Sequence, residues 1–419
     1  MMRLLVSTAL SGLLVAPAVW ASLQGQTPTS IDIHVRETAG IRRFNFPVDV
    51  RVPFPQGALS DTSHIRLVSA RTSVPAQFTV ESAWPDRSIQ WLVVDFNSSP
   101  GPAEELTLQL EYGEGVTSPP VARGVTVDEE SEAVQISAAG GTIRFNKNPS
   151  PLIASLTYRG ELITRGVNGI TITDSSGAVH DLSRVSGLQT EVLKRGPIKA
   201  LLRYTGRIPL DPTYAVPVDM SIEMPNSKGW FKVSATVDDP QKRVREIAFH
   251  TPFQFGHLPW AWDFGTNRWT YGVLRNPSDA VTLTQTVTVP PGKAAWQVRT
   301  TANGQEQLYE ASTERRNVAA GWAHIQDAKD VVAFAVEQFG LGAGTYRASF
   351  EGSGQTSIRF APAQPATRHQ LTVFAHFVQT PVHLGAATSP NAMLNPLVAT
   401  LEREQYVRSG VRLPLRGGR

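Results

Sequence analysis

The sequence has no cysteine among its 419 residues. This excludes disulfides, thiolate nucleophiles, Cys-ligated zinc, iron–sulfur clusters and a lipoprotein anchor. Neither sign of charge is in large excess, because the sequence has 39 Lys and Arg residues and 36 Asp and Glu residues. A net charge of +3 is not typical of a nucleic-acid-binding protein, so we expect no nucleic-acid partner. Hydrophobic residues make up 41% of the chain, which excludes a disordered protein and supplies a core.

Motifs for common cofactors and catalytic machineries are missing as well. The sequence contains no P-loop, GxSxG, HExxH or EF-hand pattern. The histidines show no metal-ligand spacing, and they stand mainly at His250, His257, His324, His369, His376 and His383. We therefore expect no metal and no cofactor.

The first 21 residues have the pattern of a secretory signal peptide. Arg3 gives a short positive start, an apolar stretch follows to Val15, and the run Val19-Trp20-Ala21 suits cleavage after Ala21. No later stretch reaches the roughly 18 apolar residues needed to cross a bilayer. The sequence thus predicts a secreted or periplasmic protein with no membrane span after signal cleavage.

Short strand-like segments separated by Pro, Gly, Asp and Ser turns dominate the rest of the chain. Their even spacing favours antiparallel sheets over βαβ units. We predict an all-β protein with a small N-terminal barrel over 22–122, a large antiparallel β-sandwich over 125–385, and a short helix with a basic tail over 386–419. The pair Asn395-Pro396 is typical of a helix start, and Gly410 of its end.

The segment 250–275 combines aromatic rings with polar and basic side chains, and its Gly and Pro content predicts a long loop or hairpin. Aromatic rings stack on the apolar faces of sugars, and adjacent polar groups bind hydroxyls or a uronate carboxylate. One interpretation is a carbohydrate site made of Trp260, Trp262, Asp263, Asn267 and Trp269. The alternative is an aromatic cluster that seals a loop onto the sandwich.

Several short motifs, in order along the chain, resemble one family of secreted proteins. They are Pro47, VPFPQG (52–57), HIRLV (64–68), VPAQ (74–77), WPDRSIQWLVVDF (84–96), Gly321-Trp322, IQD (325–327), AFAVEQF (333–339), IRFAP (358–362), TRHQL (367–371), PLVA (396–399) and YVRSG (406–410). This pattern resembles the YetA-like, exo-rhamnogalacturonan-lyase-like family, in which an N-terminal RIFT barrel precedes a central β-sandwich.

The resemblance implies a carbohydrate-active setting, with a polysaccharide or oligosaccharide as partner. Family members continue into a C-terminal α/α toroid, and we expect this sequence to stop where the toroid would begin. We therefore also expect a separate toroid-bearing subunit as a partner. The turn after AFAVEQF reads GLGAGTY instead of an aromatic stretch, which departs from the family pattern.

Two functions follow as expectations. The first is binding of an acidic polysaccharide, alone or as the non-catalytic part of a lyase-like assembly. The second is polysaccharide lyase activity by β-elimination on a uronate-containing glycan such as rhamnogalacturonan. Elimination needs a cation at the carboxylate and a base for the C5 proton. Candidates are Arg268 as the cation and His250, His257 or Tyr271 as the base.

Overall fold

The computed structural model describes residues 29–139, 141–158, 161–162, 168–266, 269–288, 294–312, 317–337, 339–379 and 388–411. The predicted signal peptide lies outside these residues. Every strand pairing among the described residues is antiparallel, which confirms the predicted all-β fold. None of the described helices is both long enough and apolar enough to span a membrane.

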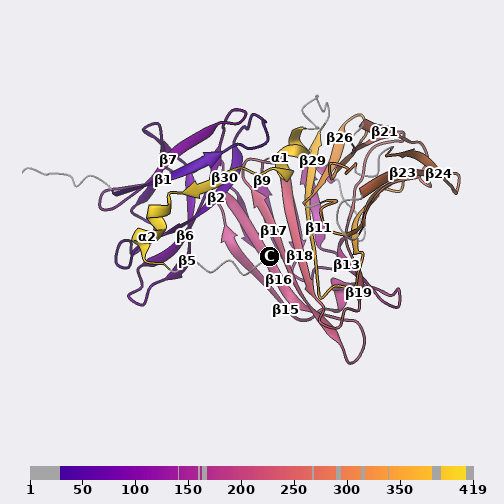
Figure 1. Cartoon of the computed structure of the whole chain (residues 1–419), viewed down its shortest axis with the longest axis horizontal. Coiled ribbons are helices and arrows are strands. Elements are labelled where there is room, and N and C mark those ends of the chain that lie inside the picture. The colour runs from indigo at the N-terminus through magenta and orange to yellow at the C-terminus, as the bar shows by residue number, and fades with distance from the viewer. Residues whose placement is uncertain are drawn as a thin grey trace, which may run out of the picture.

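The N-terminal part forms a small barrel from two sheets, drawn in indigo in Figure 1. One sheet has the order β30 (Val398–Leu401), β1 (Thr29–Arg36), β7 (Glu105–Tyr112), β3 (Ile65–Ser69) and β4 (Thr72–Val74). The other has the order β2 (Phe46–Pro53), β6 (Ile89–Ser98) and β5 (Ala76–Ala83). Alternate Val, Ile, Leu and Phe side chains of both sheets meet in one core.

The remaining strands form a sandwich with one very wide sheet. This nine-stranded sheet has the order β15 (Ser186–Arg195), β16 (Lys199–Pro209), β17 (Ala215–Pro225), β18 (Trp230–Asp238), β29 (Arg368–Gln379), β26 (Asp330–Val336), β25 (Trp322–Gln326), β20 (Trp260–Gly265) and β21 (Trp269–Leu274).

Two smaller sheets cover one face of the nine-stranded sheet. The first has the order β12 (Glu161–Leu162), β11 (Ile153–Tyr158), β10 (Gly141–Asn146), β9 (Ala133–Ala138) and β8 (Thr126–Glu129). The second has the order β14 (Val179–Asp181), β13 (Gly169–Asp174), β19 (Val244–Pro252), β28 (Gln355–Pro362), β27 (Gly344–Glu351), β22 (Ala280–Val287), β23 (Ala294–Ala302) and β24 (Gln305–Ala311).

Aromatic side chains of the two layers of the sandwich pack against each other. The rings of Phe145 on β10 and Phe231 on β18 meet edge to face with centroids 5.8 Å apart. The rings of Phe264 on β20 and Phe350 on β27 stack at 5.6 Å. One continuous hydrophobic core therefore lies on the inner face of the nine-stranded sheet. Its opposite face, which we call the outer face, does not take part in this core.

The C-terminal segment departs from the sequence prediction. We expected a helix from Asn395-Pro396 onward, but Val398–Leu401 is the strand β30, which pairs with β1 of the barrel. Leu397 and Leu401 enter the barrel core, and that burial outweighs the weak helical spacing. The helix α2 (Arg403–Ser409) begins only after Glu402 and ends at Gly410 as predicted. Figure 1 shows β30 and α2, in yellow, among the indigo strands.

A second helix, α1 (Thr388–Leu394), precedes β30 and was not predicted. It lies on the outer face of the nine-stranded sheet, where Met393 packs with Trp230, Trp322 and Phe374. A short 3-10 helix, η1 (Leu182–Arg184), follows β14.

A buried ion pair ties this C-terminal segment to the barrel. Glu37 accepts hydrogen bonds from Arg43 and from three backbone N–H groups, and Arg43 donates to the carbonyls of Ala392 and Asn395. Burial alone would raise the pKa of Glu37, but these hydrogen bonds outweigh it and lower the pKa to about 2.

Charged side chains also join the barrel to the sandwich. Asp49 on β2 and Asp95 on β6 are direct cross-strand partners, which would be unfavourable if their charges were left alone. Lys199 on β16 lies 2.9 Å from Asp49, 3.1 Å from Asp95 and 3.3 Å from Glu223. Lys194 on β15 contacts the other oxygen of Asp95 at 2.5 Å. The sandwich thus supplies the two ammonium groups that neutralise the paired aspartates of the barrel.

We expect Lys199→Met to lower the free energy of unfolding by about 3 kcal/mol, because it leaves the buried Asp95 and its neighbour Asp49 undercompensated. Urea denaturation measures the change. The matched control is Arg203→Met, which removes a half-exposed ion pair with Asp219 from the same sheet and should cost less than about 1 kcal/mol. Equal costs for the two variants would contradict a structural role for the junction.

We expect Glu37→Gln to lower stability at neutral pH by about 3 kcal/mol, because Arg43 loses its buried counter-ion. The depressed pKa means that Glu37 contributes fully above pH 4.5 and loses its contribution as the pH falls towards about 2. Denaturation midpoints measured between pH 2 and 7 should therefore converge for the two proteins at the acid end. A constant difference across this range would disprove the assignment.

Candidate functional site

The outer face of the nine-stranded sheet brings polar and aromatic side chains into rows. Asp263 on β20 pairs with His324 on β25 on one side and with Tyr271 on β21 on the other. Cross-strand partners lie on the same face with their Cβ atoms about 5 Å apart. The three residues therefore form a continuous row near the sheet edge, which we call the outer-face row (Tyr271, Asp263 and His324).

Contacts within the row orient the imidazole. His324 Nδ1 lies 2.9 Å from Asp263 Oδ1, and the two side chains are 14% and 23% exposed. The Trp322 indole stacks parallel to the imidazole at 6.1 Å. A carboxylate on Nδ1 leaves Nε2 as the atom that can accept a proton or bind a ligand.

Tyr271 presents the exposed end of the row. Its side chain is 68% exposed, and its backbone carbonyl accepts a hydrogen bond from the Tyr309 hydroxyl at 2.8 Å. That bond joins the edge strand β21 to β24 of the eight-stranded sheet. The neighbouring Gly272 is required because a Cβ there would lie 2.4 Å from the Trp262 ring.

The structure corrects the prediction for Trp260 and Trp262. Both side chains belong to the sandwich core, with exposed fractions of 6% and 2%. The segment from Trp260 to Gly265 is a strand, so Trp260, Trp262 and Phe264 share the inner face while Asp263 faces outward. The two tryptophans cannot stack on a sugar, and the alternative interpretation of a structural cluster is correct for them.

Among the described residues, the other predicted catalytic side chains lie apart from the outer-face row. His250 lies on β19 of the eight-stranded sheet, where its Nε2 contacts Thr171 Oγ1 at 3.0 Å. Burial and the nearby Arg359 lower the pKa of His250 to about 4. His257 is exposed in the bend before β20. Asn267 and Arg268 lie outside the described residues, and Trp269 is described only by its backbone pairing with Gly265.

His324 and Trp322 are the residues that sequence reasoning missed. The run Trp322-Ala323-His324 alternates as a strand, which places the ring and the imidazole on one face. That alternation was the available signal. The partner on the next strand could not be derived, because about sixty residues separate β20 from β25 along the chain.

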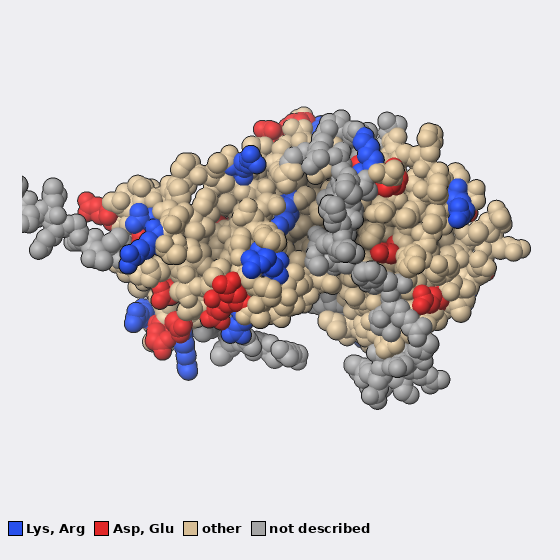
Figure 2. All heavy atoms as spheres, turned by 90° about the horizontal axis from the view of Figure 1, so that it is seen from above, with Lys and Arg blue, Asp and Glu red and all other residues tan. Residues whose placement is uncertain are grey.

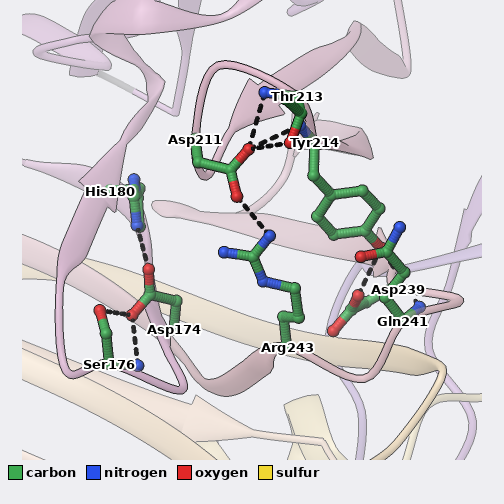
Figure 3. A network of polar contacts seen from close by, with 9 residues as sticks. All are labelled: Asp174, Ser176, His180, Asp211, Thr213, Tyr214, Asp239, Gln241 and Arg243. Atoms are coloured by element: carbon green, nitrogen blue, oxygen red, sulfur yellow. Dashed lines mark hydrogen bonds and ion pairs between the residues drawn. The ribbon is translucent and has the colours of Figure 1, made fainter.

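A second polar network lies at one end of the sandwich (Figure 3). Asp174, Asp211 and Asp239 each accept hydrogen bonds from backbone or hydroxyl groups in the turns they hold. His180 binds Asp174 at 2.9 Å, and Arg243 binds Asp211 at 2.5 Å. Burial alone would raise the pKa of Asp174, but the Ser176 and His180 hydrogen bonds lower it to about 2. These contacts satisfy the turns internally, so we assign the network a structural role.

The surface electrostatics are mixed. Figure 2 shows Lys and Arg side chains interspersed with Asp and Glu, without a broad patch of one sign on this face. Among the described residues, no cluster of three or more His, Asp or Glu side chains has the arrangement of a metal site. A ligand of this surface would therefore be recognised by local groups rather than by a general electrostatic field.

Comparison with known proteins confirms the class of the N-terminal domain. Residues 38–111 match the family model of the PcRGLX-like N-terminal RIFT barrel domain, so this part of the chain is a RIFT barrel of that type. This confirms the resemblance stated above for the barrel. No curated protein matches the sequence.

Solved structures share the overall fold. One is a protein in glycosyl hydrolase family 38 from Enterococcus faecalis, with a TM-score of 0.57, 10% identity, and coverage of 89% of this chain and 47% of that chain. Another is an alpha-mannosidase from Enterococcus faecalis V583, with a TM-score of 0.54, 11% identity, and coverage of 89% and 46%. The present chain spans about half the length of these structures, and at this identity the likeness concerns the fold alone.

We expect Trp262→Ala to destabilise the protein by about 3–5 kcal/mol, because it empties a core site. Tyr271→Ala, on the neighbouring strand β21 but on the outer face, should cost less than about 1 kcal/mol. Thermal or urea denaturation of the two variants tests the inward and outward assignments. A Trp262→Ala variant as stable as the parent would show that the indole is not a core residue.

Proposed function

We propose that this protein binds an acidic polysaccharide outside the cytoplasm, alone or as the non-catalytic part of a lyase-like assembly. Three observations support the proposal. The barrel is of the PcRGLX-like type, the fold is shared with glycosidases, and the N-terminal pattern is that of an exported protein. The observation that carries it is the outer-face row, which places an exposed aromatic ring beside polar groups near the edge of the nine-stranded sheet.

The row offers the groups that sugars require. Tyr271 provides a ring face for the apolar side of a pyranose, while Asp263 and His324 can bind hydroxyl groups next to it.

Polysaccharide lyase activity is the second candidate, and the His324–Asp263 contact favours it. In β-elimination a base removes the C5 proton of a uronate, the C4–O bond breaks, and the leaving oxygen takes up a proton. His324, oriented by Asp263, has the chemistry of the base, and Tyr271 has that of the proton donor. The cation that elimination also needs was predicted at Arg268, which lies outside the described residues.

Affinity gel electrophoresis with rhamnogalacturonan, polygalacturonate and a neutral galactan tests the binding proposal. We expect the acidic glycans to retard the protein, and Tyr271→Ala to weaken retardation about tenfold. Phe44→Ala is the matched control, because Phe44 in the barrel is also 68% exposed. No retardation by any acidic glycan, or equal effects of the two variants, would contradict the proposal.

Ultraviolet absorbance of unsaturated uronate separates binding from elimination. If the protein is a lyase, absorbance rises with the same acidic glycans, and His324→Gln lowers the rate by at least about a hundredfold. If it only binds, absorbance stays constant while retardation persists. A rise that is unchanged in His324→Gln would rule out His324 as the base.

A further inference from the structure

A second feature of the sandwich is a cavity of about 180 Å³ at one end of β26 and β29. It opens where the chain leaves β26 at Glu337 and crosses to β27 of the eight-stranded sheet. We call it the end cavity. No residue of the outer-face row or of the polar network in Figure 3 lines it.

The lining of the end cavity combines apolar and polar side chains. Tyr346 and Phe360, whose rings stack at 4.4 Å, are apolar walls together with Leu371. Glu337, Arg368, Gln370 and Thr372 supply the polar groups. Sites for small ligands usually combine such apolar walls with a few convergent polar groups. A pyranose ring has the matching shape, with C–H faces and a rim of hydroxyl groups.

The two charged groups of the cavity differ in how firmly they are held. Lys232 Nζ donates to Glu337 Oε1 at 2.7 Å, and both side chains are about one-third exposed or less. Arg368 lies 3.6 Å from Asp238, and both of these side chains are more than half exposed. An exposed pair at this distance contributes little, so Arg368 can exchange Asp238 for a ligand carboxylate at small cost.

We infer that the end cavity binds a single pyranose ring that carries a carboxylate, with Arg368 as the carboxylate contact. Its volume lies below the roughly 300–1,000 Å³ of larger ligand sites, which suits one ring rather than several. Gln370 and Thr372 bind ring hydroxyls, and the Tyr346–Phe360 wall faces the apolar side of the sugar. This inference rests on the proposed glycan-binding function and adds a second site to it.

The end cavity and the outer-face row are separate places on the same sheet. Glu337 lies four residues beyond Ala333, the cross-strand partner of His324, which is about 13 Å along a strand. The helix α1 covers Trp322, Ala335 and Phe374 between them. Binding of a polysaccharide to the outer-face row therefore does not require that the end cavity is occupied. Each site can be tested alone.

Isothermal titration calorimetry of the full chain with trigalacturonate and with the neutral galactose trimer tests the inference. We expect trigalacturonate to bind. Arg368→Gln should weaken the affinity for trigalacturonate by about tenfold or more, because a charge-assisted hydrogen bond is lost. The weak binding of the neutral trimer should not change in this variant. Arg203→Gln, which removes another arginine from the same face, is the matched control.

The outcomes separate the two proposals. If trigalacturonate and acidic polysaccharides both fail to bind the parent protein, the proposed function is wrong. If the parent protein binds trigalacturonate but Arg368→Gln and Gln370→Ala bind it equally well, the end cavity is not the site and the proposed function stands. Because Arg368 and Gln370 are exposed, neither substitution should prevent folding, and the denaturation midpoint checks this.

Discussion

The alternation of side chains along the nine-stranded sheet is the constraint on which the rest of the structure depends. Every second residue of β29, β26, β25 and β20 is used by the sandwich core, so its neighbours must face the other way. Two smaller sheets cover the inner face, and only α1 of the described elements lies over the outer face of β26. The same constraint fixes both the stability of the sandwich and the surface available for a ligand.

This constraint explains why neighbouring residues in one short segment have opposite roles. Trp262 fills the core, whereas Asp263 beside it contacts His324 on the outer face. The barrel contributes in another way. Its aspartates Asp49 and Asp95 are neutralised by lysines of the sandwich, so the two parts are joined by matched charges as well as by chain connectivity.

Much of the fold could be predicted from the sequence, because alternation and turn residues are local signals. The sequence predicted the barrel, the antiparallel sandwich and the end of α2 at Gly410. The return of Val398–Leu401 to the barrel was not, because the edge of β1 that it completes is distant in sequence. Only part of the candidate site on the outer face could be predicted from the sequence. Asp263 and Tyr271 were among the predicted site residues. The antiparallel pair of β20 and β21 at the sheet edge agrees with the hairpin, which was one of the two forms predicted for this segment. His324 required a register that no local pattern specifies.

The central claim is that glycans bind the outer face of the nine-stranded sheet, and hydrogen–deuterium exchange tests it most directly. Exchange of backbone amides is measured with and without an acidic polysaccharide, on the full chain at neutral pH. The account predicts slower exchange in β20, β21 and β25, and around Glu337 and Arg368. Slower exchange confined to the barrel, or no change in any sandwich strand, would contradict it.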